Sequence, residues 1–149
     1  MRSNLAWCGL CLVAVTACGT VRGSAPEGFA VYEPAAESFR AVSSSGVTYR
    51  VRHVDHEPRA ELKFWREAMK KRMTDAGYVF QREGELEGAI MKGTLLEVAA
   101  PLGQQDYAYL IAVFDAGPKL VIVESAGEVT KLTAAREALL AAMRATPLP

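Results

Sequence analysis

The fold is decided by the stretch Tyr-Ala-Tyr-Leu-Ile-Ala-Val-Phe-Asp (107–115) and by Lys-Leu-Val-Ile-Val-Glu-Ser (119–125), which follows a turn at Gly117-Pro118. Both stretches are rich in β-branched and aromatic residues, so they predict strands. The first is apolar on both faces, which indicates a central strand covered on both sides of a sheet. The short turn between the two favours antiparallel pairing.

Further strands are expected upstream of this pair. Residues 78–82 and 90–100 form strand-like segments, the second ending at Pro101, and they extend the pair into an antiparallel meander. Nearer the N-terminus, residues 38–42 and 47–53 predict a hairpin, because Ser43-Ser44-Ser45-Gly46 between them supplies turn chemistry. The second strand of the hairpin alternates between Val47, Tyr49, Val51 and His53 on one face and Thr48, Arg50 and Arg52 on a wet face.

Two helices are predicted. The first opens at Pro58, where a first helical position tolerates proline, and ends at Gly77. Its apolar stripe has spacings of three and four and comprises Leu62, Trp65, Met69, Met73 and Ala76. The second helix covers about 131–145, with Thr130 or Thr133 as its cap and Pro147 beyond its end. Its buried stripe consists of Leu132, Ala135, Leu139 and Met143.

The order of these elements is hairpin, helix, meander, helix, which predicts an α+β fold with an antiparallel β-sheet packed with two α-helices. The meander strands 107–114 and 120–127, followed by a helix with Leu139 and Met143, resemble the end of Mog1/PsbP-like domains. The N-terminal hairpin and the long helix with Phe64-Trp65 fit the same order, so the resemblance covers about 28–149. It implies partner binding and assistance in assembling envelope or photosynthetic complexes, and it brings no shared catalytic residue.

The N-terminus has the three parts of a secretory signal: a short charged start with Arg2, an apolar run over 5–16, and a small-residue end. The run is too short for a permanent membrane span, which needs about 20 apolar residues. Val15-Thr16-Ala17-Cys18 resembles a bacterial lipobox, which implies cleavage before Cys18 and three acyl chains on that residue. The predicted organisation is a signal peptide over 1–17, lipidated Cys18 with a flexible tether over 18–28, and a single domain over 29–149. The alternative is an ordinary secretory signal with Cys18 as a stray thiol.

The lipidated cysteine predicts the location of the protein. Gly19 stands where an Asp retains enterobacterial lipoproteins in the inner membrane, so we expect an outer-membrane anchor facing the periplasm. Cys8 and Cys11 leave with the signal peptide. The mature chain therefore keeps only Cys18, and we expect no disulfide, no thiolate nucleophile and no cysteine metal site.

Composition narrows the class of protein. The chain has 17 Lys+Arg and 17 Asp+Glu, and half of its residues are hydrophobic. A balanced charge without a basic stripe argues against nucleic-acid binding, and the hydrophobic content fits a folded domain. No phosphate loop or catalytic motif is present, so we predict no cofactor and no enzymatic activity.

Three clusters of polar residues are candidates for a metal site or a catalytic site. His53-Val54-Asp55-His56-Glu57 holds both histidines, but on an extended strand they point to opposite sides, so we interpret it as a polar strand end and predict no metal site. Ser43 to Ser45 lacks a nucleophile elbow and is interpreted as a turn. Glu83, Glu85 and Glu87 alternate with Gly84 and Gly88 and are interpreted as a solvated hairpin turn.

Two functional hypotheses rank ahead of a third, a metal-dependent enzyme around His53 and His56. The first is a lipid-anchored, non-enzymatic accessory module that binds an envelope protein partner through a surface with Arg50, Arg52 and Phe64. The second is a periplasmic carrier of a small ligand, with a pocket between the sheet and the first helix lined by Trp65, Tyr107 and Tyr109. The simpler interpretation of these three aromatic residues is packing in the core.

Overall fold

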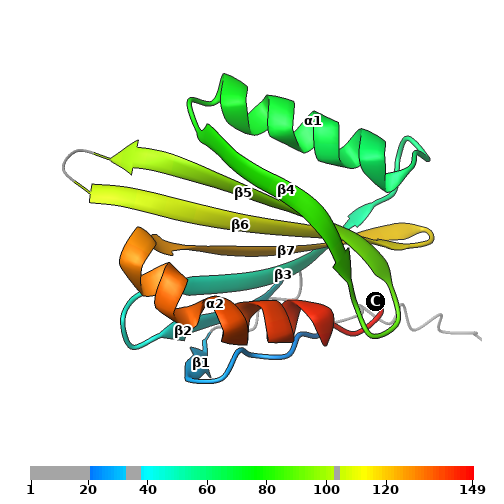
Figure 1. Cartoon of the computed structure of the whole chain (residues 1–149). Coiled ribbons are helices and arrows are strands. Elements are labelled where there is room, and N and C mark those ends of the chain that lie inside the picture. Colours follow the sequence, from blue (N-terminus) through cyan, green and yellow to red (C-terminus); the bar gives the residue numbers. More distant parts are fainter. Residues whose placement is uncertain (1–20, 33–37, 103–104) are drawn as a thin grey trace, which may run out of the picture.

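The structure is a computed structural model that describes residues 21–32, 38–102 and 105–149. Among the described residues, seven strands form one antiparallel sheet with the order β1-β2-β3-β7-β6-β5-β4, and two helices pack against it (Figure 1). The elements are β1 (Phe29–Val31), β2 (Ser38–Ser43), β3 (Thr48–Asp55), α1 (Leu62–Asp75), β4 (Val79–Glu87), β5 (Lys92–Leu102), β6 (Gln105–Ala116), β7 (Lys119–Glu128) and α2 (Val129–Arg144). The predicted α+β class, the hairpin and the antiparallel meander are confirmed.

Strand β6 lies in the middle of the meander, as its double-sided apolar pattern predicts. It pairs with β5 on one side and β7 on the other, and Leu110 to Phe114 are buried in succession. On one face the sheet packs against α2, whose Leu139 and Met143 are completely inaccessible to solvent. On the same face the ring of Phe114 lies against Gly93 of β5, where a Cβ atom would lie 2.5 Å from its Cδ1.

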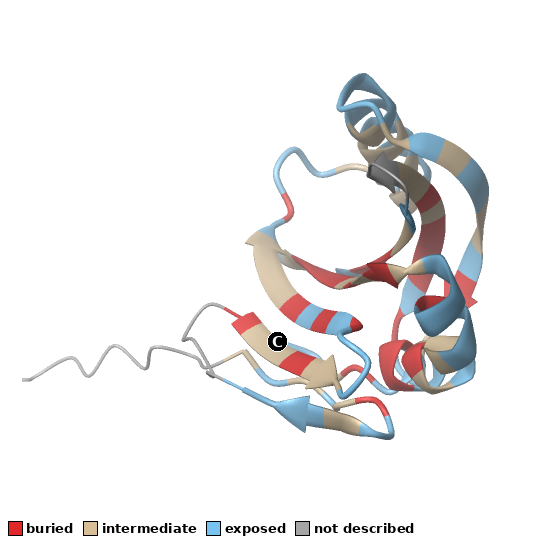
Figure 2. Cartoon of the chain, turned by 90° about the vertical axis from the view of Figure 1, so that its left-hand side faces the viewer, coloured by how far each residue is buried: buried red, intermediate tan, exposed pale blue. Residues whose placement is uncertain are grey.

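Helix α1 covers the other face, but it is held less tightly than α2. Leu62, Trp65, Met69 and Met73 contact a second cluster on the sheet, in agreement with the predicted stripe. Ala76, its fifth predicted member, is exposed, because the helix ends at Asp75 and Ala76 is its C-cap. None of the residues of α1 is fully buried, whereas α2 buries four of its side chains (Figure 2). The two faces of the sheet are therefore covered to different degrees.

The starts of both helices differ from the predictions, whereas α1 ends as predicted, with Gly77 at positive φ after its C-cap Ala76. Helix α1 begins at Leu62 and not at Pro58, because the preceding loop is bound to the β6–β7 turn: the backbone N–H of His56 donates to the carbonyl of Pro118. Helix α2 begins at Val129, and neither Thr130 nor Thr133 caps it. The hydroxyl of Thr130 donates instead to the carboxylate of Glu128.

The predicted turn at Glu83 to Glu87 is wrong. These residues belong to the edge strand β4, which pairs with β5 from Gly84 opposite Leu95 to Glu87 opposite Lys92. The turn comes later, where the N–H of Gly88 donates to the carbonyl of Met91. Glu83 accepts a hydrogen bond from Lys70 of α1 at 3.1 Å, so cations of the helix hold this carboxylate on the strand.

Part of the predicted tether packs on the domain. Val21 and Ala25 lie against the cluster beneath α2, and Pro26 is buried. Residues 18–20 lie outside the described residues, together with the predicted signal peptide. Strand β1, which the sequence did not predict, follows this segment and pairs with β2. Because both hydrophobic clusters are formed by residues between Val21 and Met143, we expect the segment 21–149 to fold by itself.

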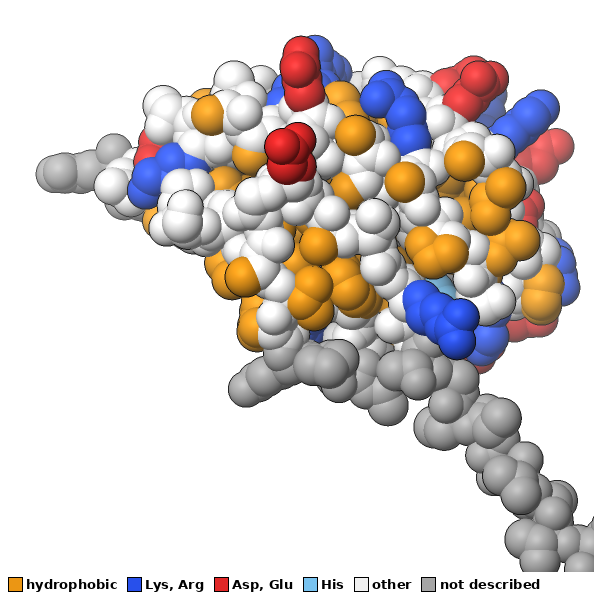
Figure 3. All heavy atoms as spheres, turned by 90° about the horizontal axis from the view of Figure 1, so that it is seen from below, with side chains coloured by type: hydrophobic (Ala, Val, Ile, Leu, Met, Phe, Trp, Pro, Cys, Tyr) orange, Lys and Arg blue, Asp and Glu red, His pale blue; other side chains and the backbone are white. Residues whose placement is uncertain are grey.

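No helix among the described residues is long and apolar enough to cross a membrane. Seen from below, the surface shows hydrophobic side chains over the middle of the face and charged side chains of both signs around them (Figure 3). Mixed charge on this face agrees with the balanced composition of the chain.

The unequal packing of the two helices gives the first prediction. Leu139→Ala should lower the free energy of unfolding by about 2–5 kcal/mol, because this side chain of α2 is fully buried against the sheet. Leu62→Ala, a matched substitution on α1, should cost about 1 kcal/mol or less, because Leu62 is only half-buried. Urea unfolding of both variants measures this, and equal losses would show that α1 is packed as tightly as α2.

Candidate functional site

A cavity of about 790 Å³ lies between α1 and the sheet. Its floor is formed by the middle of β6 and β7, and its roof is the inner side of α1. We call it the α1 groove. Most of its lining is apolar and includes Trp65, Met69, Met73, Ile111, Ile122 and Ala126. A volume of this size is in the range of small-molecule binding sites.

The sequence creates this space by combining large and small residues. Trp65, Met69 and Met73 project from α1 toward the sheet and keep the helix axis at a distance from it. Ala100 on β5 and Ala126 on β7 leave room beneath the helix, since their methyl groups cannot fill the gap. The groove is therefore open where the strands carry alanine and where α1 carries long side chains.

The polar part of the groove is a carboxylate held by two strands. Glu124 of β7 accepts hydrogen bonds from Arg52 of β3, from Nε to Oε2 at 3.0 Å and from Nη2 to Oε1 at 3.2 Å. The hydroxyl of Tyr109 on β6 donates to Oε1 of Glu124 at 2.7 Å. Glu124 therefore fixes the orientation of one cation and one phenol in the lining of the groove.

The burial and contacts of Glu124 and Tyr109 shift the pKa values of both residues. Burial alone would raise the pKa of Glu124, but hydrogen bonds from Arg52 and Tyr109 and the charges of Arg52 and Arg50 lower it below its ordinary value of 4.5. Burial, followed by the negative charge of Glu124, raises the pKa of Tyr109. At neutral pH the groove therefore contains an ionised carboxylate and a neutral phenol.

The three residues predicted to line a pocket do line one cavity. Trp65 comes from α1, and Tyr107 and Tyr109 share one face of β6. The ring of Tyr109 lies 6.2 Å from that of Tyr78, centroid to centroid, which extends the aromatic lining. Nε1 of Trp65 is buried and has no hydrogen-bond partner among the described residues, so it is available to a ligand.

The three residues predicted as a partner surface separate into two places. Arg52 lines the α1 groove, and exposed Arg50 lies on the same face of β3. Phe64 is 50% exposed on α1, outside the lining of the groove, and packs edge to face against Trp65 with ring centroids 5.4 Å apart. The surface of the two arginines thus adjoins the groove, while Phe64 lies apart from its lining.

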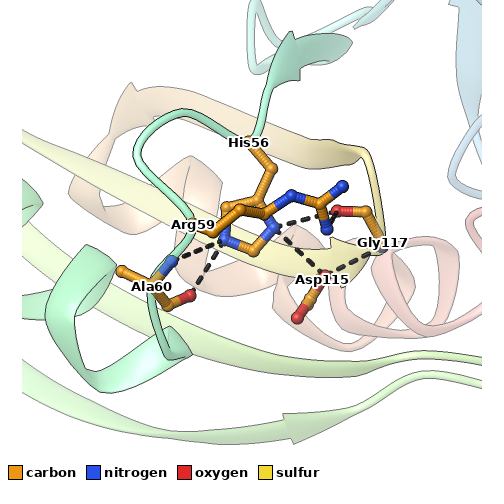
Figure 4. A network of polar contacts seen from close by, with 5 residues as sticks. All are labelled: His56, Arg59, Ala60, Asp115 and Gly117. Atoms are coloured by element: carbon orange, nitrogen blue, oxygen red, sulfur yellow. Dashed lines mark hydrogen bonds and ion pairs between the residues drawn. The ribbon is translucent and has the colours of Figure 1, made fainter.

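The start of α1 is fixed by His56 (Figure 4). Its Nδ1 lies 3.0 Å from the carbonyl oxygen of Gly117, and its Nε2 lies 2.9 Å from that of Ala60. Arg59 also donates to the carbonyl of Gly117, at 2.7 Å, and Oδ1 of Asp115 lies 3.4 Å from Nδ1. This network joins the loop before α1 to the β6–β7 turn, so it sets one end of the groove.

The two histidines do not converge. His53 follows the alternation of β3 and lies opposite Val121, while His56 lies in the loop beyond the strand. Burial, followed by the charge of Lys119, lowers the pKa of His53, which is therefore neutral at neutral pH. Across residues 21–32, 38–102 and 105–149, no group of three or more His, Cys, Asp or Glu side chains is placed to hold a metal ion.

Sequence reasoning missed Glu124, Tyr78 and the methionines as parts of the site. Glu124 could have been noticed, because it is the first charged residue after four successive apolar residues in β7. Its partners Arg52 and Tyr109 are distant in sequence, and only the pairing of β3, β7 and β6 brings them together.

A second cavity, of about 680 Å³, lies beside α2 at the ends of β4, β5 and β6. Glu97 lies in its lining between Arg82, at 2.8 Å, and Arg136. The carboxylate therefore already neutralises part of the charge of these guanidinium groups. The cavity is more polar than the α1 groove, and its charged groups tie α2 to the sheet.

No family model matches the chain, and no curated protein matches it. Among solved structures, the chain is similar to the crystal structure of PA94, a protein of unknown function from Pseudomonas aeruginosa. The two structures have a TM-score of 0.63 at 13% sequence identity, over 81% of this chain and 98% of the other. At this identity the similarity shows the fold alone.

The depressed pKa of Glu124 gives the second prediction. Glu124→Gln should lower the free energy of unfolding by about 1–3 kcal/mol at neutral pH, because Arg52 loses its charged acceptor. A carboxylate with a lowered folded-state pKa stabilises the fold above pH 4.5, and this contribution disappears as the pH falls through the folded-state value. The gap between wild type and variant should therefore narrow toward about pH 3.

Urea unfolding at the two pH values measures this gap. Glu85→Gln is the matched control, since Glu85 is exposed on the edge strand β4 and should change stability little at either pH. A gap for Glu124→Gln that stays constant with pH would mean that this carboxylate is not held by charge.

Proposed function

We propose that this protein is a non-catalytic binding module of the bacterial envelope that takes an apolar ligand into the α1 groove. The observation that carries the proposal is the cavity of about 790 Å³ lined by Trp65, Tyr107 and Tyr109. The space adjoins the cluster beneath α1 and opens to solvent, so a ligand can enter without unfolding the core. This favours the ligand-carrier hypothesis over the accessory-module hypothesis.

Binding in the groove would be driven by burial of apolar surface, at about 25 cal/mol for each Å² removed from water. The side chains of α1 are only partly buried against the sheet, and a bound ligand would give them further contacts. The polar groups of the lining would orient the ligand, and the carboxylate among them is already held by Arg52 and Tyr109. Both oxygens of the Glu124 carboxylate already accept hydrogen bonds from Arg52 or Tyr109. Such a carboxylate is better suited to orienting a ligand than to transferring a proton, which supports a module without enzymatic activity.

The proposal includes attachment through a lipid on Cys18, at the outer membrane and facing the periplasm. The lipobox-like residues before Cys18 support it. Val21 packs on the domain, and three residues of extended chain from Cys18 span only about 10 Å. A lipidated chain would therefore hold the domain close to the membrane, a source of apolar ligands.

A second candidate is the accessory module that binds a protein partner. It is favoured by Phe64, which is half exposed on α1 although it is a large apolar side chain. The order of elements also supports the proposal of a Mog1/PsbP-like domain, since a hairpin precedes α1 and a meander precedes α2. In this alternative, Phe64 and the arginines of β3 would contact the partner.

Ligand binding can be followed through Trp65. In the segment 21–149 Trp65 is the only tryptophan, because the other one is Trp7. Titration with Nile red, a neutral apolar dye, should raise the dye fluorescence saturably and quench Trp65 by energy transfer. Ala126→Phe should weaken dye binding at least about tenfold, because the added ring fills the groove.

The matched control is Ala134→Phe, which places the same ring on the exposed side of α2. It should bind the dye as wild type does. Unchanged dye binding by Ala126→Phe, or the absence of saturable binding by wild type, would show that the groove is not a ligand site. Either result would favour the accessory-module alternative.

Lipidation has its own test. Expression of the full chain in a bacterial host with radiolabelled palmitate should give a labelled protein in the membrane fraction, and Cys18→Ala should lose the label. Cys8→Ala is the control, because that residue lies in the predicted signal peptide and should leave labelling intact. Equal labelling of the Cys18→Ala variant would reject the anchor.

A further inference from the structure

Two arginines lie directly opposite each other on the sheet. Arg40 of β2 pairs in register with Arg50 of β3, so their side chains project on the same face from adjacent strands. Like charges at directly opposite positions destabilise a sheet. A pair of this kind is explained if the two cations serve to hold an anion.

The surroundings leave the pair with excess positive charge. Arg52 lies on the same face two residues beyond Arg50, and its partner is Glu124. Nε of Arg40 donates to the hydroxyl of Ser38 at 3.2 Å, which leaves its charge unbalanced. Among the described residues, Arg40 and Arg50 form no salt bridge, and the carboxylate of Glu124 opposite Arg50 is already bound by Arg52.

This basic patch continues into the α1 groove. The pairing register places Arg40, Arg50, Glu124 and Ile111 in one row across β2, β3, β7 and β6. Arg52 and Glu124 line the groove, and Ile111 belongs to its floor. The row therefore passes from the two cations of β2 and β3, over the carboxylate of Glu124, to the buried side chain of Ile111. On the helix side, Arg72 adds a further cation to the lining.

We propose that the ligand of the α1 groove is a single-chain amphiphile with an anionic head group. Its alkyl chain lies on the floor formed by Ile111, Ile122 and their neighbours, and Arg40 and Arg50 bind its head group beside Arg52. This inference rests on the proposed function and names the class of ligand. Guanidinium groups suit it, because they bind carboxylates and phosphates through two parallel hydrogen bonds.

The dimensions agree with such a ligand. The groove extends from β3 to β5, which is three strand spacings, or about 14 Å. An alkyl chain of medium length covers this distance while its head group stays at β3. The three arginines stand at that end, where the side of the sheet formed by β1, β2 and β3 has few contacts with α1.

The test compares two probes of equal chain length, laurate and dodecanol, in titrations of the segment 21–149 followed by Trp65 fluorescence and calorimetry. Wild type should bind laurate at least about tenfold more tightly than dodecanol, and the double variant R40A/R50A should lose this preference. R40K/R50K should retain most of it. K92A/R144A is the control that removes the same number of charges, since Lys92 and Arg144 are exposed on β5 and α2, outside the lining of the groove.

Each outcome has one meaning. Equal affinity of wild type for laurate and dodecanol overturns the head-group assignment and leaves the apolar groove standing. Failure of both probes in a protein that binds Nile red overturns the amphiphile, and failure of all three also rejects the proposed function. An acidic peptide that binds wild type and not R40A/R50A, with laurate binding unchanged by the variant, assigns the arginines to a protein partner and overturns the proposal.

Stability provides an independent measurement. Because R40A/R50A removes a repulsive cross-strand pair, its Tm should equal or exceed that of wild type. A loss of laurate binding together with a higher Tm assigns the arginines to the ligand. A lower Tm would mean that they support the fold, and it would overturn the argument from repulsion.

Discussion

The structure depends on the burial of β6 on both of its faces. Five successive residues from Leu110 to Phe114 are buried, so a layer must cover the sheet above and below this strand. The chain supplies α2 for one face and α1 for the other. The fold follows from this requirement, since a strand of this composition at an edge would leave apolar surface in water.

The two covers differ, and the difference creates the candidate site. Helix α2 places aliphatic side chains directly on the sheet and leaves Leu139 and Met143 fully buried. Helix α1 carries long side chains above a floor with alanines at one end, so the same sheet has a solid core on one side and a cavity on the other. The α1 groove is thus a packing deficit, and a ligand with an apolar surface would remove it.

The charged side chains beside the α1 groove lie mainly at its β3 side. Glu124 holds Arg52 and Tyr109 at the side of the groove that faces β3, and beyond it Arg40 and Arg50 form no salt bridge among the described residues. The sheet accepts like charges on adjacent strands at a cost in stability. Such local costs are expected where residues serve a ligand and not the fold. The apolar floor and the charged side together describe an amphiphilic partner.

The sequence by itself determined the class of the fold and the type of its long elements, except for residues 83–87 of β4, which it predicted as a turn. Periodicity is a local signal, so the double-sided pattern of β6 and the stripe of Leu132, Leu139 and Met143 on α2 could be recognised without coordinates. Exposure of Phe64 followed from its displacement from the stripe of α1. The start of α1 could not be found in this way, because it depends on the contact of His56 with Gly117, far along the chain. Tertiary structure alone decided that Glu124 joins Arg52 and Tyr109, that Arg40 faces Arg50, and that α1 leaves a cavity. The physical reason is that the register of the strands and the distance of α1 from the sheet are set by contacts between segments far apart in the sequence, which no local pattern contains.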